Sequence, residues 1–230
     1  MKNLLTYILV LFSSVVLAQQ KGIVTYEIVI GDDPRALLRE TDTQRLRNAQ
    51  SLAEELSFNL YFSSTESFFE INEKPIDTDY FSDLFAESAT NPEYSVYSDL
   101  KKQSYSYSFF STFKSETFLL TDRANYQWNI TDESKTIDHI LVYKAIGKTR
   151  DNLEIEAWFA PEIPISAGPE IYMGLPGLIL ELQKGYTKYV SKKIEFTDQY
   201  TQKIKNDLKG ISINEAEKEK MLQEKINNFK

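Results

Sequence analysis

Four glutamates that lie close together in the sequence are the residues best suited to chemistry. Glu154 and Glu156 are two apart in EIEAWFAP, where the alternation of polar and apolar residues predicts a strand. Their carboxylates would therefore share one face of that strand. With Glu162 and Glu170 they are the candidate acids of a hydrolase, whose two carboxyl groups must face each other roughly 5–10 Å apart. Acids at alternate positions also form ordinary solvated faces, and this interpretation is the simpler one.

The chain has one histidine, His139, and no cysteine. This composition excludes Cys/His zinc sites and cysteine nucleophiles, and Ser-His-Asp chemistry would depend on His139 alone. His139 lies in IDHILVY, where alternation predicts that it shares a strand face with Ile137 and Leu141. We therefore expect no catalytic residue, no metal and no cofactor.

The stretch GPEIYMGLPGLILEL, residues 168–182, has the glycines of a loop that could hold a ligand. A phosphate-binding loop needs a Lys-Ser/Thr pair after its glycines, and a nucleophile elbow needs a serine between them. The Lys-Ser/Thr pair is absent, because Gly177 is followed by Leu178 and Ile179. The serine is absent as well, because leucine and proline stand between Gly174 and Gly177. Pro176 and Gly177 instead predict a type II turn that leads into a strand buried on both faces. The stretch is either the corner before that strand or a docking loop.

The composition is acidic and aromatic. The 230 residues carry a formal net charge of −8, with 14 tyrosines and 14 phenylalanines. An acidic protein is repelled by phosphate backbones and by anionic lipid surfaces, so we expect no nucleic-acid partner. Aromatic residues favour half-buried strands, and many short strands with few helices are typical of a β sheet or barrel.

The first residues, MKNLLTYILVLFSSVVLAQQ, have the pattern of a secretory signal. A lysine precedes a short apolar run, and small residues follow it up to Ala18. We expect a signal peptide over 1–18 and a single mature domain over 19–230. No cysteine follows the cleavage site, and no later run reaches the ~20 apolar residues of a membrane-spanning helix. A cleaved, unlipidated periplasmic or secreted protein is expected, without a membrane span after cleavage.

The periodicity of the mature chain predicts a mainly β (α+β) fold. We expect a curved antiparallel sheet or open half-barrel, with a helical insertion over 33–56 and a polar helix at the C-terminus. The insertion would begin with Asp33 as its cap, and Ser212 to Glu215 has the spacing of a capping box for the last helix. A further short helix is expected over 80–87. The main expected strands are 22–31, 56–64, 66–73, 104–113, 154–161, 178–185 and 189–196, with the second and third joined as a hairpin.

The segment AWFAPEIPISAGPEIYMGLPGLILEL, residues 157–182, closely resembles the signature of the GLPGLI family. The family pattern is an aromatic pair, then Pro-Glu-Ile-Pro, Gly-Pro and the hexapeptide Gly-Leu-Pro-Gly-Leu-Ile. Weaker resemblance covers most of the mature chain. Family members often carry a cysteine where this chain has Val142 and Tyr143, so a thiol role is not expected here. The candidate docking loops of this segment carry Trp158, Pro161, Glu162, Pro164, Gly168, Pro169, Gly174, Leu175, Pro176, Gly177, Leu178 and Ile179.

The resemblance implies a secreted or periplasmic protein of Gram-negative bacteria, in a family without an established activity. Its members are often encoded near outer-membrane TonB-dependent transporters, which suggests an accessory role in envelope transport. We therefore expect a non-catalytic binding protein whose partner is an outer-membrane transporter, another envelope protein, or an apolar or peptide ligand. The alternatives are a structural surface protein without a specific ligand and a carboxylate-dependent hydrolase.

Overall fold

The computed structural model describes residues 21–32, 34, 36–38, 40–72, 95–111, 113–149 and 153–228. The expected signal peptide, the expected helix over 80–87 and the expected cap Asp33 lie outside these ranges. Among the helices described, none is both long enough and apolar enough to span a membrane.

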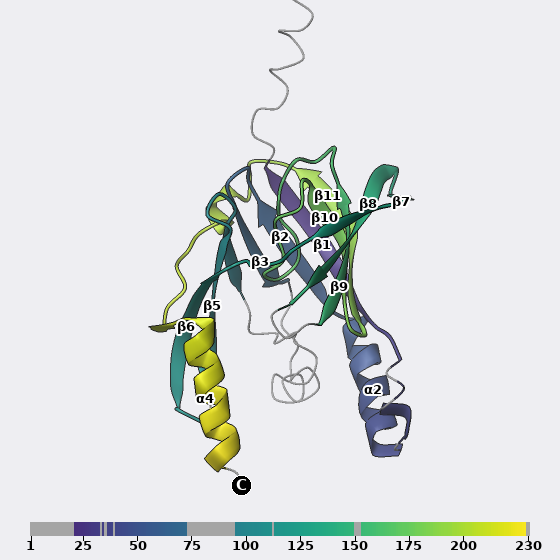
Figure 1. The fold of residues 1–230 in the computed structure, drawn as a ribbon. Coiled ribbons are helices and arrows are strands. Elements are labelled where there is room, and N and C mark those ends of the chain that lie inside the picture. Colours follow the sequence, from purple (N-terminus) through teal and green to yellow (C-terminus); the bar gives the residue numbers. More distant parts are fainter. Residues whose placement is uncertain are drawn as a thin grey trace, which may run out of the picture.

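One open sheet of twelve strands forms the described part of the chain, so the prediction of a mainly β fold is confirmed. Neighbouring strands are antiparallel, except that β12 runs parallel to β6. Figure 1 shows that the sheet curves, so that β5 and β6 lie across from β7 and β8. In edge-to-edge order the strands are β12 (Ile211–Ile213), β6 (Glu116–Arg123), β5 (Ser104–Ser111), β4 (Val96–Asp99), β3 (Glu66–Ile71), β2 (Ser57–Phe62), β1 (Gly22–Ile30), β11 (Thr187–Phe196), β10 (Leu178–Lys184), β9 (Glu154–Ala160), β8 (Ile140–Lys148) and β7 (Asn129–Ile137).

Strand β1 joins the two halves of the sheet, because it pairs with β2 on one side and with β11 on the other. The expected hairpin of β2 and β3 is confirmed. Ser63 closes it, since its hydroxyl accepts hydrogen bonds from the backbone N–H groups of Thr65 and Glu66. The expected burial of β10 on both faces is also confirmed, since every residue from Leu178 to Leu182 is buried.

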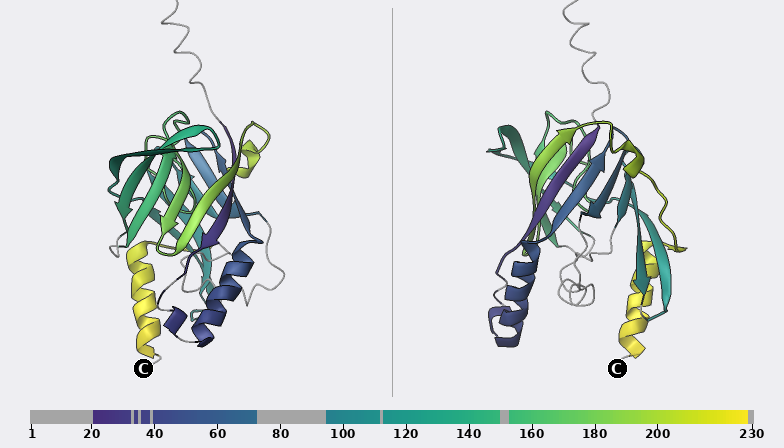
Figure 2. Two further views of the ribbon diagram at one scale, coloured as in Figure 1. Left: turned by 90° about the vertical axis from the view of Figure 1, so that its right-hand side faces the viewer. Right: turned by 180° about the vertical axis from the view of Figure 1, so that it is seen from behind.

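The described ranges contain two α-helices, which lie at the same end of the sheet and well apart from each other (Figure 2). The helix α2 (Glu40–Ala53) follows the 3-10 turn η1 (Ala36–Leu38) and buries Ala49 and Ala53. A second 3-10 turn, η2 (Thr201–Lys203), follows β11. The helix α4 (Glu215–Asn228) lies beside β5 and β6 and has no buried residue.

The cap of α4 differs from the prediction. Ser212 lies in β12, and the capping box is formed by Asn214 and Glu217 instead. The Asn214 side chain accepts from the Glu217 N–H at 3.0 Å, and the Glu217 carboxylate accepts from the Asn214 N–H at 2.8 Å. The helix therefore begins two residues later than the Ser-x-x-Glu pattern predicted.

The prediction for His139 is wrong. Asp138 and His139 form the turn between β7 and β8, and both have positive φ angles, of 44° and 68°. Two consecutive residues with positive φ match the twist that a two-residue hairpin requires. His139 is consequently exposed at a loop tip and does not share a strand face with Ile137 and Leu141.

Aromatic rings fill the core beneath the centre of the sheet. Phe58 stacks on Phe69 with ring centroids 5.4 Å apart, and Tyr189 meets Phe58 edge-on at 5.5 Å. The Tyr26 hydroxyl is buried beside them and donates a 2.5 Å hydrogen bond to the Ile179 carbonyl. This bond ties the start of β10 to the middle of the sheet.

Candidate functional site

The segment 161–177, which contains most of the predicted docking residues, folds back onto the inner side of the curved sheet. Figure 1 shows it as the green loop between β9 and β10, lying between the two ends of the sheet. Ile163, Ile165, Tyr172 and Met173 are each no more than 3% exposed and belong to the same core cluster as the strands. The segment therefore supplies part of the core of the sheet.

Much of the Gly-Leu-Pro-Gly-Leu-Ile hexapeptide is buried, and tight contacts at Gly177 and at the preceding Gly168 leave no room for a side chain. A Cβ atom on Gly177 would lie 2.3 Å from the Ala160 carbonyl oxygen, and one on Gly168 would lie 2.7 Å from the Ile179 side chain. The positive φ angle falls on Gly174, at 98°, and Gly177 has none. The predicted type II turn centred on Pro176 and Gly177 is therefore wrong, because Gly177 serves close approach of two backbone segments. Leu175, Leu178, Ile179, Gly168 and Pro169 are buried as well.

Five of the predicted docking residues are exposed, and we call them the proline rim: Pro161, Glu162, Pro164, Gly174 and Pro176. Backbone hydrogen bonds join the two parts of the rim. The Leu178 N–H donates to the Ile163 carbonyl at 3.0 Å, and the Gly174 N–H donates to the Ser166 hydroxyl at 2.9 Å. The structure thus brings the Pro-Glu-Ile-Pro and Gly-Leu-Pro-Gly loops together.

A buried ion pair holds the middle of the segment in place. The Glu170 carboxylate lies 2.9 Å from the Lys184 ammonium and accepts a 2.7 Å hydrogen bond from the Tyr189 hydroxyl. The Glu170 and Lys184 side chains are 8% and 9% exposed, and Glu170 has a positive φ of 53°. Burial, followed by the nearby Glu170 charge, raises the pKa of the Tyr189 phenol well above its usual value. A buried charge that loses its partner is costly, so this pair fixes the segment against β10 and β11.

A strap, residues 124–128, covers the segment from the other side. It connects β6 to β7, which lie near opposite edges of the sheet. The Trp128 indole N–H donates to the Met173 carbonyl at 2.9 Å, and Tyr126 packs on Tyr172 with ring centroids 5.1 Å apart. Burial, followed by the neighbouring Tyr172, raises the pKa of the Tyr126 phenol. A Cβ atom on Gly147 would lie 2.9 Å from the Trp128 ring, so this glycine makes room for the indole.

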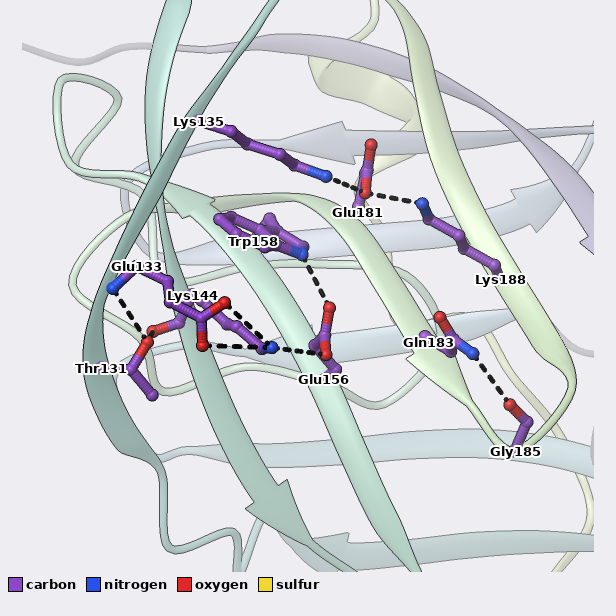
Figure 3. A network of polar contacts seen from close by, with 10 residues as sticks. All are labelled: Thr131, Glu133, Lys135, Lys144, Glu156, Trp158, Glu181, Gln183, Gly185 and Lys188. Atoms are coloured by element: carbon purple, nitrogen blue, oxygen red, sulfur yellow. Dashed lines mark hydrogen bonds and ion pairs between the residues drawn. The ribbon is translucent and has the colours of Figure 1, made fainter.

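Trp158 does not belong to the rim. It lies on the opposite face of the sheet, in the polar network of Figure 3. Its indole N–H donates to Glu156 at 2.8 Å, and the Lys135 ammonium lies 4.2 Å from its ring centroid. Glu156 also forms a 3.0 Å ion pair with Lys144. The Trp158 side chain thus contacts side chains of its own sheet and is not part of an exposed loop.

Glu181 lies between two lysines in the same network. Its carboxylate is 2.5 Å from the Lys135 ammonium and 2.8 Å from that of Lys188. Burial raises the pKa of this carboxyl, but the hydrogen bonds and charges of the two lysines outweigh burial and lower it overall. These two ion pairs hold β7, β10 and β11 together, because Lys135 lies in β7, Glu181 in β10 and Lys188 in β11.

The four candidate acids do not converge. Glu156 is held by Lys144 on the outer face of the sheet, whereas Glu170 is held by Lys184 on the inner side. Glu154 and Glu162 are exposed at different places, one at the start of β9 and one on the proline rim. The described residues also contain no group of three histidine, aspartate or glutamate side chains that could hold a metal ion.

The sequence did not single out the ion pair or the strap. Glu170 was considered only as a hydrolase acid, and no local pattern connects it with Lys184 or Tyr189. The pattern of YQWNITD, residues 126–132, predicts a strand, but the structure begins β7 only at Asn129. The strap was therefore not expected, and the partners of Tyr126 and Trp128 lie 45 or more residues away.

Comparisons with known proteins support the fold. A family model described as "Protein of unknown function (Porph_ging)" matches residues 147–181, which span the end of β8, β9, the inner segment and most of β10. No curated protein matches the chain. Two solved structures of PNGF-II, in space groups C2 and P21, each have a TM-score of 0.56, at 14% and 15% sequence identity, and cover 89% and 88% of this chain. The chain spans 33% of the length of those structures, and the likeness shows that the two proteins share a fold over this part.

Proposed function

We propose that this chain is a non-catalytic binding protein of the bacterial envelope, and that the proline rim is its docking surface. In this proposal the curved sheet is an open half-barrel whose inner side is filled by its own segment 161–177. The protein would act in the periplasm or outside the cell, after removal of residues 1–18. Its partner would be an outer-membrane transporter or another envelope protein, as the GLPGLI resemblance implies.

The observation that carries the proposal is that buried side chains within the same loop attach the exposed residues of the rim to the core. Pro161, Pro164 and Pro176 are exposed, whereas Ile163, Ile165 and Leu175 between them are no more than 3% exposed. From Glu162 to Ala167 and from Gly174 to Gly177, every second residue is buried and anchors the loop in the core. A loop that is already ordered loses little conformational entropy when a partner binds. This favours a docking role over the alternative that the loop is exposed without binding a partner.

The filled inner side argues against two other functions. A lipid carrier needs an empty apolar cavity, but Tyr172, Met173 and Leu175 occupy the inner side. A carboxylate hydrolase needs two facing acids, and the candidate acids are separated by the sheet or bound to lysines.

A second candidate is a structural protein without a specific partner. It is favoured by the burial of Gly168, Gly177, Leu178 and Ile179, since a core role alone explains why these residue types are needed. The two candidates differ only in what the exposed residues of the rim do.

The test therefore changes exposed residues and leaves the core intact. Replacing all of 174–179 would remove Leu178 and Ile179 from the core and would unfold the protein under either proposal. Instead, the full chain 1–230, which keeps the expected signal peptide, is expressed with a C-terminal tag in its own organism as wild type, Glu162→Lys, Pro176→Ser and Leu141→Ser. Leu141 is a matched control because it is 46% exposed on β8, in a different part of the molecule.

After mild cross-linking, a docking rim predicts an envelope protein that co-purifies with wild type and Leu141→Ser. Recovery should fall at least tenfold with Glu162→Lys and Pro176→Ser, and the purified partner should bind wild type directly. Equal recovery with all four chains, or none above an untagged strain, would contradict the docking role and favour the structural one.

A further inference from the structure

A hydrophobic hollow lies between α4 and the end of β5. In this part of the molecule β5 and β6 extend beside the helix (Figure 1). The volume of the hollow is about 140 Å³. It does not involve the inner segment or the proline rim. The residues that line it are Phe109, Phe110, Ser111, Phe113, Met221, Leu222 and Lys225.

The apolar residues around the hollow are unusually exposed for their size. Phe110 is 53% exposed, Leu222 46% and Ile226 49%. Leu222 and Ile226 are four residues apart and lie on one side of α4. A helix in a globular protein normally buries its apolar stripe, yet α4 contains no buried residue.

In the part of the chain that the structure describes, one unpaired positive charge lies at the hollow, beside an ion pair. The Lys114 ammonium lies 4.8 Å from the Phe113 ring centroid and forms a 3.0 Å ion pair with Glu224. Lys225 lines the hollow itself and, within the described ranges, forms no ion pair. An unneutralised lysine beside apolar surface is notable in a protein of net charge −8, and it favours a ligand with a negative group.

We propose that this hollow binds a polypeptide partner through an aromatic side chain that has a carboxylate next to it. The size fits, because a protein cavity of about 150 Å³ lined by leucine, isoleucine and phenylalanine holds one benzene molecule. The phenyl ring would lie against Phe109, Phe113 and Leu222, which line the hollow, and it can pack against the aromatic edges there. The neighbouring carboxylate would pair with Lys225. This surface is separate from the proline rim, so the inference does not depend on the proposed function.

The probe is a fluorescein-labelled peptide with a phenylalanine between two aspartates, and its matched control carries alanine in place of phenylalanine. Binding to the mature chain is measured by fluorescence anisotropy. The test variants are Leu222→Ser and Lys225→Glu, and the controls are Leu141→Ser and Lys205→Glu. Leu222 and Leu141 are both 46% exposed, and Lys205 is exposed outside the hollow. Because α4 has no buried residue, neither test variant should unfold the sheet, and circular dichroism checks this.

The proposal predicts that the phenylalanine peptide binds wild type and both control variants with equal affinity. Affinity should fall at least tenfold with Leu222→Ser, with Lys225→Glu and with the alanine peptide. Failure to bind at millimolar protein, or equal binding to all variants, would overturn it. Two other results would also overturn it. The first is a dimer in sedimentation experiments that Leu222→Ser abolishes, and the second is binding of the protein to phosphatidylcholine vesicles instead of the peptide.

Discussion

Gly177 shows at the scale of one residue why the hexapeptide needs its residue types. The residue has no positive φ, so conformational freedom is not the reason for a glycine there. The reason is contact, since a Cβ atom would lie 2.3 Å from the Ala160 carbonyl oxygen and 2.6 Å from its carbon. Both atoms belong to the backbone and cannot swing away. The start of β10 can therefore approach the end of β9 only if residue 177 has no side chain.

Gly177→Ala should lower the free energy of unfolding by about 1–3 kcal/mol, as expected when an extra methyl group is forced into a packed site. The control is Gly31→Ala, where the nearest atom to the new Cβ would be 3.5 Å away. At such a compatible site alanine leaves stability unchanged or raises it by about 0.4–1 kcal/mol. Urea unfolding of the two variants measures the difference, and equal stability would contradict the steric account.

Glu181 provides a test that depends on pH. Its pKa in the folded protein lies below its ordinary value of 4.5, because the two lysines outweigh burial. The charged form therefore stabilises the fold above pH 4.5, and this stabilisation is lost as the pH falls through the lower, folded-state pKa.

Glu181→Gln should cost about 1–3 kcal/mol at pH 7, the range for hydrogen bonds to charged groups. The difference from wild type should shrink when unfolding is measured below pH 4.5. The control Glu195→Gln removes an exposed ion pair with Lys193 and should cost less than about 1 kcal/mol at either pH. A cost for Glu181→Gln that did not change with pH would show that its charge is not what stabilises the network.

At the scale of elements, the strap and the inner segment depend on each other. The strap lies outside the strands, and the Trp128 indole N–H joins it to the segment by donating a hydrogen bond to the Met173 carbonyl. That carbonyl belongs to a residue that is 2% exposed, so it would lose its partner in a place that water does not readily reach.

Trp128→Phe should therefore cost about 1–3 kcal/mol and raise amide hydrogen exchange in the inner segment, around residues 172–175. Trp158→Phe is the matched control, because its indole donates to the partly exposed Glu156. Hydrogen exchange measured by mass spectrometry should show little change in the inner segment of that variant. Similar exchange in the two variants would mean that the strap does not hold the segment.

Local patterns were sufficient to predict many of the elements. Alternation located β1, β2 and β5, a continuous apolar run located β10, and the hydroxyl residues around Ser63 located the first hairpin. The same rule failed at His139, because the apolar residues on either side continue the alternation across a turn that needs two positive φ angles. The capping-box pattern placed the cap of α4 two residues early, since Ser212 and Asn214 both have capping chemistry and only tertiary structure assigns Ser212 to β12.

The site was less predictable than the elements. The sequence identified the Pro-Glu-Ile-Pro and Gly-Leu-Pro-Gly loops, and the structure does join them in one rim. It could not separate the exposed residues of the rim from the buried ones, because both kinds occur in one short loop. Trp158 was grouped with the loops by proximity in sequence, but strand alternation places it on the other face of the sheet.

At the scale of the whole molecule, the protein's own chain occupies the inner side of the curved sheet. The inner segment, the Glu170–Lys184 pair and the strap fill the space that a lipid carrier of this shape would leave open. Binding surfaces must then lie on the outside, where the chain offers the proline rim and the hollow beside α4. The central claim is that the rim is one of these surfaces.

A photoreactive amino acid placed at single positions of the mature chain, in the living organism, tests this claim most directly. Positions 162 and 176 lie on the rim, and position 141 is the exposed control on β8. Each of these side chains points away from the core, so the substitutions should leave the fold intact. The account predicts that illumination links positions 162 and 176 to the same envelope protein and that position 141 gives no such product. The same product from position 141, or none from either rim position, would contradict it.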